Sequence, residues 1–260
     1  MNTNDVFAHF SSILDNMLDN SYFFDTYFQA PYFLEDVHGS RNNKSFPEHL
    51  HIFCGATRVC IFDETYVYVV KFDISHDAFG SACEREEYIY NVATRAGLNQ
   101  YFAEVQYLGT YVKTIYFYSS STIARNMTWY DLDPDFETNF ILKRNKFGCR
   151  HEITISLPLY AYPKASSHKY NFFSERNEIE YKEKAKKITS PMRDRNLAIA
   201  MDFIYEYGEE AYQELTDFMY EYNINDLHTG NLADINGHYC IIDYAGFHSS
   251  SYERSNSYYA

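Results

Sequence analysis

Asp226-Leu227-His228-Thr229-Gly230-Asn231 is the stretch on which the expected fold depends. It follows a helical pattern and precedes Tyr239-Cys240-Ile241-Ile242, a short apolar run that ends in Asp243. An Asp-Asn loop, a β-hairpin and a second Asp after the return strand can bring three oxygen-bearing side chains to one divalent cation. Any one of these Asp residues alone would more simply be a turn or cap residue, so the prediction rests on their combination.

Together these segments resemble the catalytic and metal-binding loops of the protein-kinase superfamily. The match is closest to the variant with a DLHxGN signature, which is familiar from aminoglycoside phosphotransferases and from kinase-like proteins of phages. The resemblance implies that Asp226 is the catalytic base, that Asn231 and Asp243 hold Mg²⁺, and that His228 shapes the loop. Tyr244-Ala245-Gly246 stands where the family has Phe-Gly.

Two positions just before the motif depart from the phosphotransferase pattern. Asn225 stands where those proteins usually have Gly, and Ile224 replaces their leading His. Because that His braces the loop, an apolar Ile predicts support by packing rather than by hydrogen bonding.

The chain upstream of the motif predicts a strand-rich lobe. Runs at 51–54, 58–62 and 66–72, with turns at 55–57 and 63–65, predict a three-stranded antiparallel meander. A helix over 83–96, ended by Gly97, follows. We expect further strands around 105–108, 114–118 and 153–159, a charged irregular linker at 131–150, and a lobe of five antiparallel strands with one helix.

Helical patterns flank this lobe on both sides. Apolar spacing predicts helices over 4–19, over 174–188 and over 192–222, the last interrupted near Gly208. The predicted class is therefore α+β, with two lobes of the kinase type. The expected parts are a helical and aromatic N-terminal extension (1–48), a kinase-like N-lobe (49–162) and a truncated, mainly helical C-lobe (163–260).

The resemblance also implies residues for ATP. Lys71 stands where the family places its phosphate-contacting lysine, although an exposed edge charge is the alternative. Glu86 is the expected partner of Lys71 because it shares the stripe of Ile89 and Ala93; Glu84 and Glu87 remain alternatives. The other expected nucleotide contacts are a phosphate-covering turn and an adenine-binding hinge, formed by Gly55, Thr57, Arg58, Tyr160 and Tyr162.

Composition excludes several other classes of protein. Hydrophobic residues make up 46% and charged residues 22% of the 260-residue chain, which is typical of globular proteins. A net charge of −14 disfavours nucleic acids and anionic membranes as partners. The five cysteines lack zinc spacing, and no signal peptide or membrane span is evident. We expect a cytoplasmic protein, in the host cytoplasm if it is phage-encoded.

The sequence as printed ends at Ala260, soon after Gly246, so we expect the peptide-holding parts of a full kinase lobe to be missing. Either Met1–Pro47, a second copy or a host partner should then cover apolar surface beside the site. The predicted function is ATP- and Mg²⁺-dependent phosphoryl transfer, to a protein hydroxyl first and to a small molecule second. The alternatives are a non-catalytic kinase-fold binding or inhibitor protein and a nucleotidyl (AMP) transferase.

Overall fold

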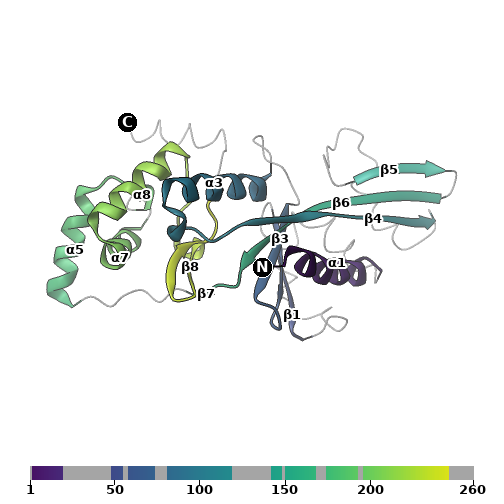
Figure 1. Ribbon diagram of the computed structural model, residues 1–260, viewed down its shortest axis with the longest axis horizontal. Helices are drawn as coiled ribbons and strands as arrows, with labels where there is room; N and C mark the ends of the chain where they lie inside the picture. Colours follow the sequence, from purple (N-terminus) through teal and green to yellow (C-terminus); the bar gives the residue numbers. More distant parts are fainter. Residues whose placement is uncertain are drawn as a thin grey trace. The chain divides into compact units, whose positions relative to one another are not determined.

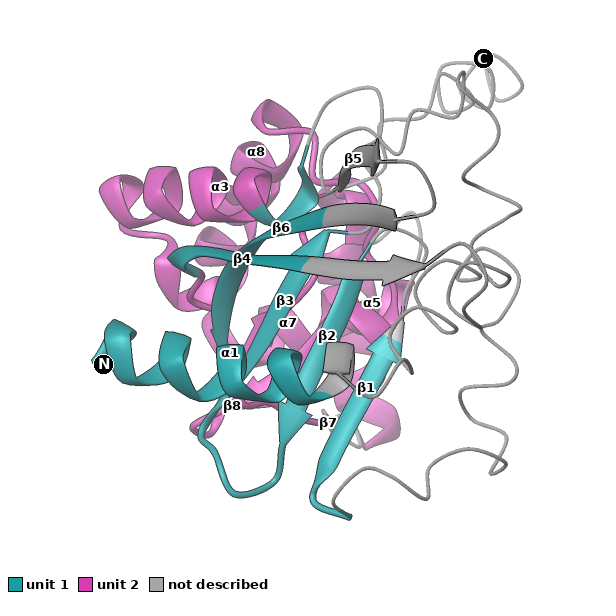
Figure 2. Ribbon diagram, turned by 90° about the vertical axis from the view of Figure 1, so that its right-hand side faces the viewer, with its two compact units in different colours: residues 1–83, 106–162 teal, residues 84–105, 163–260 magenta. Residues whose placement is uncertain are grey.

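The computed structural model describes residues 2–19, 48–54, 58–73, 81–118, 142–147, 150–167, 174–192 and 196–245. The chain divides into two compact units, residues 1–83 with 106–162 and residues 84–105 with 163–260 (Figure 2). The class is α+β, as predicted. The predicted boundary after residue 162 coincides with a unit boundary, whereas residues 84–105, expected in the strand-rich lobe, group with the helices of unit 2.

Unit 1 is built on one sheet (Figure 1). Its strands are β1 (Leu50–Cys54), β2 (Arg58–Asp63), β3 (Tyr68–Asp73), β4 (Gln106–Tyr118), β5 (Leu142–Phe147) and β6 (Arg150–Pro163). They lie in the order β1-β2-β3-β6-β4, and β5 pairs with β6. The antiparallel pairings of β1 with β2 and of β2 with β3 confirm the predicted meander.

The second half of this sheet differs from the prediction in two ways. β4 is one strand where two were expected, because the chain passes Gly109 (φ +135°) with a register shift and continues pairing with β6. β5 lies within the stretch predicted to be an irregular linker. A long β6 offers pairing partners along its length, and this tertiary pairing outweighs the low strand propensity of a charged segment.

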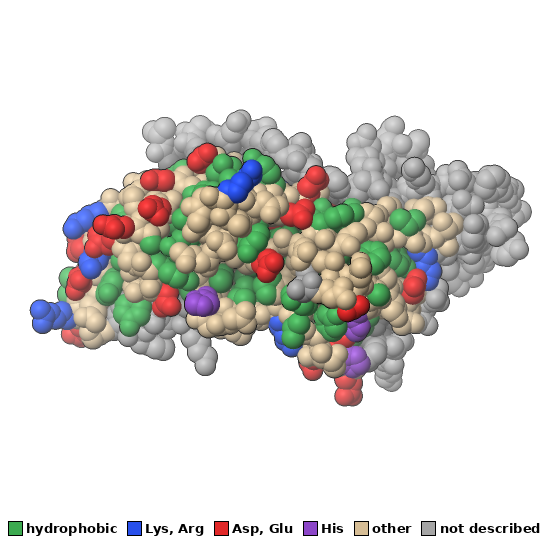
Figure 3. Space-filling view, in the orientation of Figure 1, with side chains coloured by type: hydrophobic (Ala, Val, Ile, Leu, Met, Phe, Trp, Pro, Cys, Tyr) green, Lys and Arg blue, Asp and Glu red, His purple; other side chains and the backbone are tan. Residues whose placement is uncertain are grey.

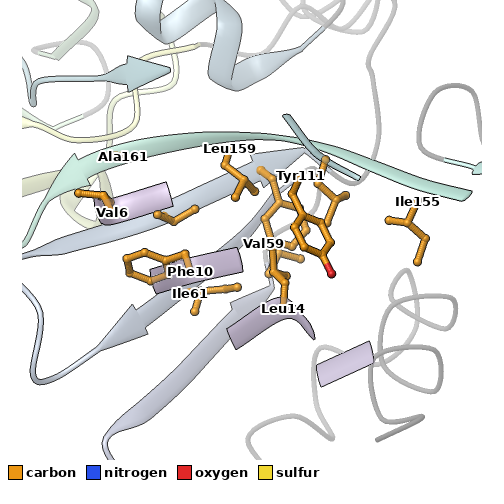
Figure 4. Close-up of a cluster of buried hydrophobic side chains, with 12 residues drawn as sticks. Val6, Phe10, Leu14, Val59, Ile61, Tyr111, Ile155, Leu159 and Ala161 are labelled. Carbon is orange, nitrogen blue, oxygen red and sulfur yellow. The ribbon is translucent and has the colours of Figure 1, made fainter. Parts of the chain in front are cut away.

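Helix α1 (Thr3–Asp19) packs on one face of the sheet and belongs to the core of unit 1 (Figure 2). Val6, Phe10 and Leu14 are spaced four residues apart and are 2%, 0% and 0% exposed. They belong to one buried cluster with side chains of the strands, most of which Figure 4 labels. The strand residues of this cluster are Val59, Ile61, Val70, Phe72, Tyr111, Ile155, Leu157, Leu159 and Ala161. Residues 1–48 were expected to form an extension outside the strand-rich lobe, whereas α1 belongs to the core of unit 1. Residues 20–47 lie outside the described residues.

Polar contacts fix the register of α1 on the sheet. His9 Nε2 lies 2.9 Å from Asp63 Oδ2, and the His9 ring stacks on Tyr66 at 4.4 Å. Burial raises the pKa of Asp63, but hydrogen bonds from the hydroxyl and backbone N–H of Thr65 and from His9 outweigh it and hold this pKa below its ordinary value. The Asp63 carboxylate is therefore charged at neutral pH and anchors both the β2–β3 turn and the helix.

Unit 2 is mainly helical, as predicted. It contains α3 (Ala82–Ala96), η3 (Asn99–Tyr101), α5 (Glu175–Lys187), α7 (Leu197–Tyr207) and α8 (Glu209–Glu221), followed by η4 (Thr229–Asn231). A three-stranded sheet consists of β7 (Ser166–Ser167), β8 (Leu232–Ile235) and β9 (His238–Ile241). Gly208 separates α7 from α8 at φ +92°, and Gly97 ends α3 at φ +77°, so both predicted breaks are confirmed.

Among the described residues on the face drawn in Figure 3, acidic side chains are scattered between basic and apolar ones. Among the described residues, no helix is long and apolar enough to span a membrane.

We predict that Phe10→Ala destabilises the protein by about 3–5 kcal/mol, because a fully buried aromatic ring is lost from the core of unit 1. Phe53→Ala, on β1 of the same unit, is the matched control, since its side chain is 47% exposed and should cost under about 0.5 kcal/mol. Urea unfolding followed by circular dichroism measures both. Equal costs for the two variants would show that α1 does not belong to the core.

Candidate functional site

A tight hairpin brings the two halves of the predicted site together within unit 2. β8 and β9 pair antiparallel, with Leu232 opposite Ile241. Asn236 and Gly237 connect them at φ +53° and +82°, the left-handed values that a two-residue hairpin turn requires. At the open end, Ile242 N–H donates to the Asn231 carbonyl at 2.9 Å. Asn231 and Asp243 therefore lie at the same end of one hairpin.

The end of α8 sets the direction in which the chain enters the motif. Asn223 adopts φ +52°, and its N–H and that of Ile224 donate to the carbonyls of Tyr220 and Met219 at 3.3 and 2.8 Å. Two such backbone hydrogen bonds together with a left-handed residue form a common helix C-terminus, in which Asn can replace Gly. Ile224 is 0% exposed, so the expectation that this residue supports the loop by packing is confirmed.

Asp226 and Asn231 are joined across the loop. Asn231 is buried, and its Nδ2 donates to the Asp226 backbone carbonyl at 2.6 Å. Because the amide nitrogen is used in this way, Oδ1 is the atom of Asn231 that can serve a cation. The half-buried Asp226 carboxylate accepts no hydrogen bond from any residue that the structure describes.

His228 shapes the loop through its own ring. Its Nδ1 accepts from Gly230 N–H at 3.0 Å and thereby caps η4, while the side chain is exposed. A Cβ on Gly230 would lie 2.9 Å from His228 Cε1, so this ring explains why position 230 carries glycine. The geometry agrees with a loop-shaping role for His228 and places its ring on the surface.

Glu86 faces inward, as its spacing predicts. It is 0% exposed, whereas Glu84 is exposed and Glu87 is half-buried. Its Oε1 accepts from the backbone N–H groups of Tyr244 and Ala245, at 3.0 and 3.3 Å. A contact between Glu86 and the segment after Asp243 was not predicted, and no local sequence signal could reveal it because 158 residues separate Glu86 from Tyr244.

Lys71 lies in the interior strand β3 of unit 1, between β2 and β6, so it is not a charge on an edge strand. Its Nζ lies 4.2 Å from the ring centre of Tyr162, a cation–π contact. Since Val70 and Phe72 face the α1 core, Lys71 points to the opposite face of the sheet. Lys71 and Glu86 belong to different units, and their pairing stays a prediction.

The remaining expected nucleotide contacts lie on the same sheet or outside the described residues. Arg58 is half-buried at the start of β2. Tyr160 and Tyr162 are 5% and 2% exposed in β6, which limits what their rings can offer a ligand. Gly55 and Thr57 lie outside the described residues. The phosphate-covering turn and the adenine hinge therefore stay predictions.

The donor set fits a hard cation better than zinc. Among the described residues, no three or more His, Cys, Asp and Glu side chains are grouped as a metal site. Burial raises the pKa of the Cys240 thiol, on β9 of the hairpin, to about 11, so this thiol stays neutral at neutral pH. What remains at the motif is two carboxylates and one amide oxygen, from Asp226, Asp243 and Asn231, and these are the ligand types that Mg²⁺ prefers.

We predict that Asn231→Ala destabilises the protein by about 1–3 kcal/mol, because the buried Asn231 side chain is lost and the backbone carbonyl of Asp226 loses its donor. Thr229→Ala, in the same η4 turn but exposed, should stay within about 0.5 kcal/mol of the parent. Thermal unfolding compares the two variants, and a stable Asn231→Ala would contradict the bond across the loop.

The sequence was compared with protein-family models and with curated proteins. No protein-family model matches the chain, and no curated protein matches it. The kinase-like resemblance therefore stays a prediction from the sequence motif that runs from Asp226 to Asn231 and from Asp243.

Proposed function

We propose that the chain is an ATP-dependent phosphotransferase of the kinase-like type, with Mg²⁺ as its metal and a protein hydroxyl as its first acceptor. The observation that carries the proposal is the grouping at one end of the β8–β9 hairpin. There Asn231 is bonded both to Asp226 and to the backbone next to Asp243. Two acidic residues and an asparagine, from two stretches of sequence that hydrogen bonds join at this end of the hairpin, suit this chemistry better than a purely structural loop.

Each residue of the group has a distinct part in the proposed transfer. The Asn231 amide oxygen and the Asp243 carboxylate hold Mg²⁺. The cation, when bound, neutralises charge on the ATP phosphates. The oxygen of the acceptor hydroxyl bonds to the γ-phosphorus of ATP, and Asp226 accepts the proton of that hydroxyl. The bond from the γ-phosphorus to the bridging oxygen breaks, and ADP leaves. Lys71 orients the phosphates.

The proposed role of Asp226 as a base requires a carboxylate that a substrate hydroxyl can reach. Hydrogen bonds from protein donors would compete for the oxygens of that carboxylate. The Asp226 carboxylate receives none from the described residues and is half-buried, so it can take a bond from an acceptor hydroxyl. In the rest of the loop, the Asn231 side chain donates to the Asp226 backbone carbonyl, and the His228 ring accepts from the Gly230 N–H.

Two further parts of the proposal concern partners. The acceptor is a protein hydroxyl or, second, a small molecule, and the other partner is a second copy of the chain or a host protein in the cytoplasm. Transfer of AMP instead of phosphate would use the same residues. The isotope experiment below distinguishes the two reactions, and a thermal shift with ATP, with and without Mg²⁺, tests the non-catalytic alternative.

We predict that Asp226→Ala keeps its affinity for ATP but transfers phosphate slower by a factor on the order of 10² or more. Because the carboxylate has no protein partner in the described residues, the free energy of unfolding should change by less than about 0.5 kcal/mol. Incorporation of label from γ-labelled ATP measures the transfer. Asp217→Ala, an exposed carboxylate on α8, is the control.

Equal incorporation by Asp226→Ala and the parent would remove Asp226 from the chemistry. Label from α-labelled but not from γ-labelled ATP would replace phosphoryl transfer with AMP transfer. A parent protein that shows no thermal shift with ATP and Mg²⁺ would favour the non-catalytic binding protein.

We predict that Asp243→Asn remains folded but loses the gain in ATP affinity that Mg²⁺ gives the parent protein, because a cation ligand loses its charge. Calorimetric titration with ATP, with Mg²⁺ and then with a chelator, measures this difference. Asp234→Asn, on β8 of the same hairpin, is the control. An unchanged effect of Mg²⁺ in folded Asp243→Asn would exclude Asp243 from the metal site.

A further inference from the structure

Tyr244 carries a hydroxyl at a position where the family resemblance has a phenylalanine. The side chain is 0% exposed, and its ring packs edge-on against Phe102 with centres 5.0 Å apart. A phenylalanine would fill this space equally well. The hydroxyl, however, donates to the backbone carbonyl of Ala103 at 2.7 Å, which ties residue 244 to the segment that follows η3.

The backbone on both sides of Asp243 is held by hydrogen bonds. Before it, Ile241 O accepts from Ala103 N–H at 2.8 Å, and Ile242 N–H donates to Asn231 at 2.9 Å. After it, the N–H groups of Tyr244 and Ala245 both donate to the buried Glu86 carboxylate. Asp243 is thus the middle residue of a short strip that is fixed at each neighbouring position.

We propose that the Tyr244 hydroxyl and the Glu86 carboxylate are positioning groups that hold Asp243 in one arrangement for its cation. The inference rests on the proposed function, since it assigns a role to groups that touch neither metal nor nucleotide. A phenylalanine ring at this position would be held by packing alone, because it has no hydroxyl to donate. In this chain a directional bond to Ala103 adds to the packing and keeps residue 244 from rotating away.

The expected consequence is a change in metal affinity rather than in chemistry. If the strip around Asp243 samples other arrangements, the apparent affinity for the cation falls in proportion to the competent fraction. Saturating cation then restores the competent form, so the rate at saturation should stay near that of the parent. A residue with a purely structural role would lower stability without this selective effect on the metal.

The test compares two buried tyrosines of unit 2 that each lose one hydroxyl bond. Tyr244→Phe loses the bond to Ala103, whereas Tyr212→Phe loses a bond to Ser190 Oγ of 2.6 Å that lies in the helical part of the unit. Tyr212 is 1% exposed, so the two variants are matched in burial and in the group removed. Mn²⁺ binding to the full chain with ATP, followed by electron paramagnetic resonance, measures cation affinity.

We expect Tyr244→Phe to bind Mn²⁺ roughly fivefold more weakly than the parent, the equivalent of one hydrogen bond, and Tyr212→Phe to bind as the parent does. Both variants should lose similar thermal stability. Glu86→Gln keeps an oxygen acceptor without its charge, so it should weaken Mn²⁺ binding in the same direction. It also serves as the second variant should Tyr244→Phe fail to fold.

The outcomes separate the inference from the function on which it rests. A parent chain that binds no Mn²⁺ in the presence of ATP would overturn the proposed function itself. A parent that binds Mn²⁺, together with Tyr244→Phe and Glu86→Gln that bind it equally well, would overturn the positioning role alone. A transfer rate of Tyr244→Phe that saturating Mg²⁺ does not restore would also overturn it.

Discussion

The buried carboxylate of Glu86 is the interaction on which the candidate site depends. A charge removed from water is tolerated only where donors replace the lost hydration. Glu86 obtains two of these from backbone N–H groups of Tyr244 and Ala245, which approach it only because the β8–β9 hairpin returns the chain to α3. The same bonds satisfy the backbone N–H groups of two buried residues. Helix α3 and the end of the hairpin therefore stabilise each other.

Two carboxylates of unit 2, those of Glu86 and Asp226, differ in burial and in the hydrogen bonds that they accept. Glu86 is fully buried, and its carboxylate holds the backbone N–H groups of Tyr244 and Ala245. Asp226 is half-buried, and its carboxylate has no donor among the described residues, so its charge is available to a ligand. Side chains of the same type thus differ in role because of the donors around them, and neither role follows from sequence position alone.

Tyrosine serves this protein as a buried hydrogen-bond donor as well as an apolar residue. The chain has 27 of them. Tyr244 bonds to Ala103, Tyr207 to the Tyr239 carbonyl, and Tyr111 to Asp15 on α1. The bond from Tyr111 is the chief cause that lowers the pKa of Asp15. Each bond joins segments distant in sequence, which gives the aromatic cores of the two units a directional component that phenylalanine lacks.

Local pattern determined much of this protein: the meander, the two glycine breaks, the inward face of α3, and the hairpin that brings Asn231 near Asp243. These features follow from periodicity and turn chemistry, which act over a few residues. Only the tertiary structure decided that α1 belongs to the core of unit 1, that β5 forms on the edge of β6, and that Glu86 binds the backbone at Tyr244. Those outcomes depend on which surfaces and unpaired backbone groups meet after the chain has folded, and contacts between residues as distant as 86 and 244 leave no periodic trace in the sequence.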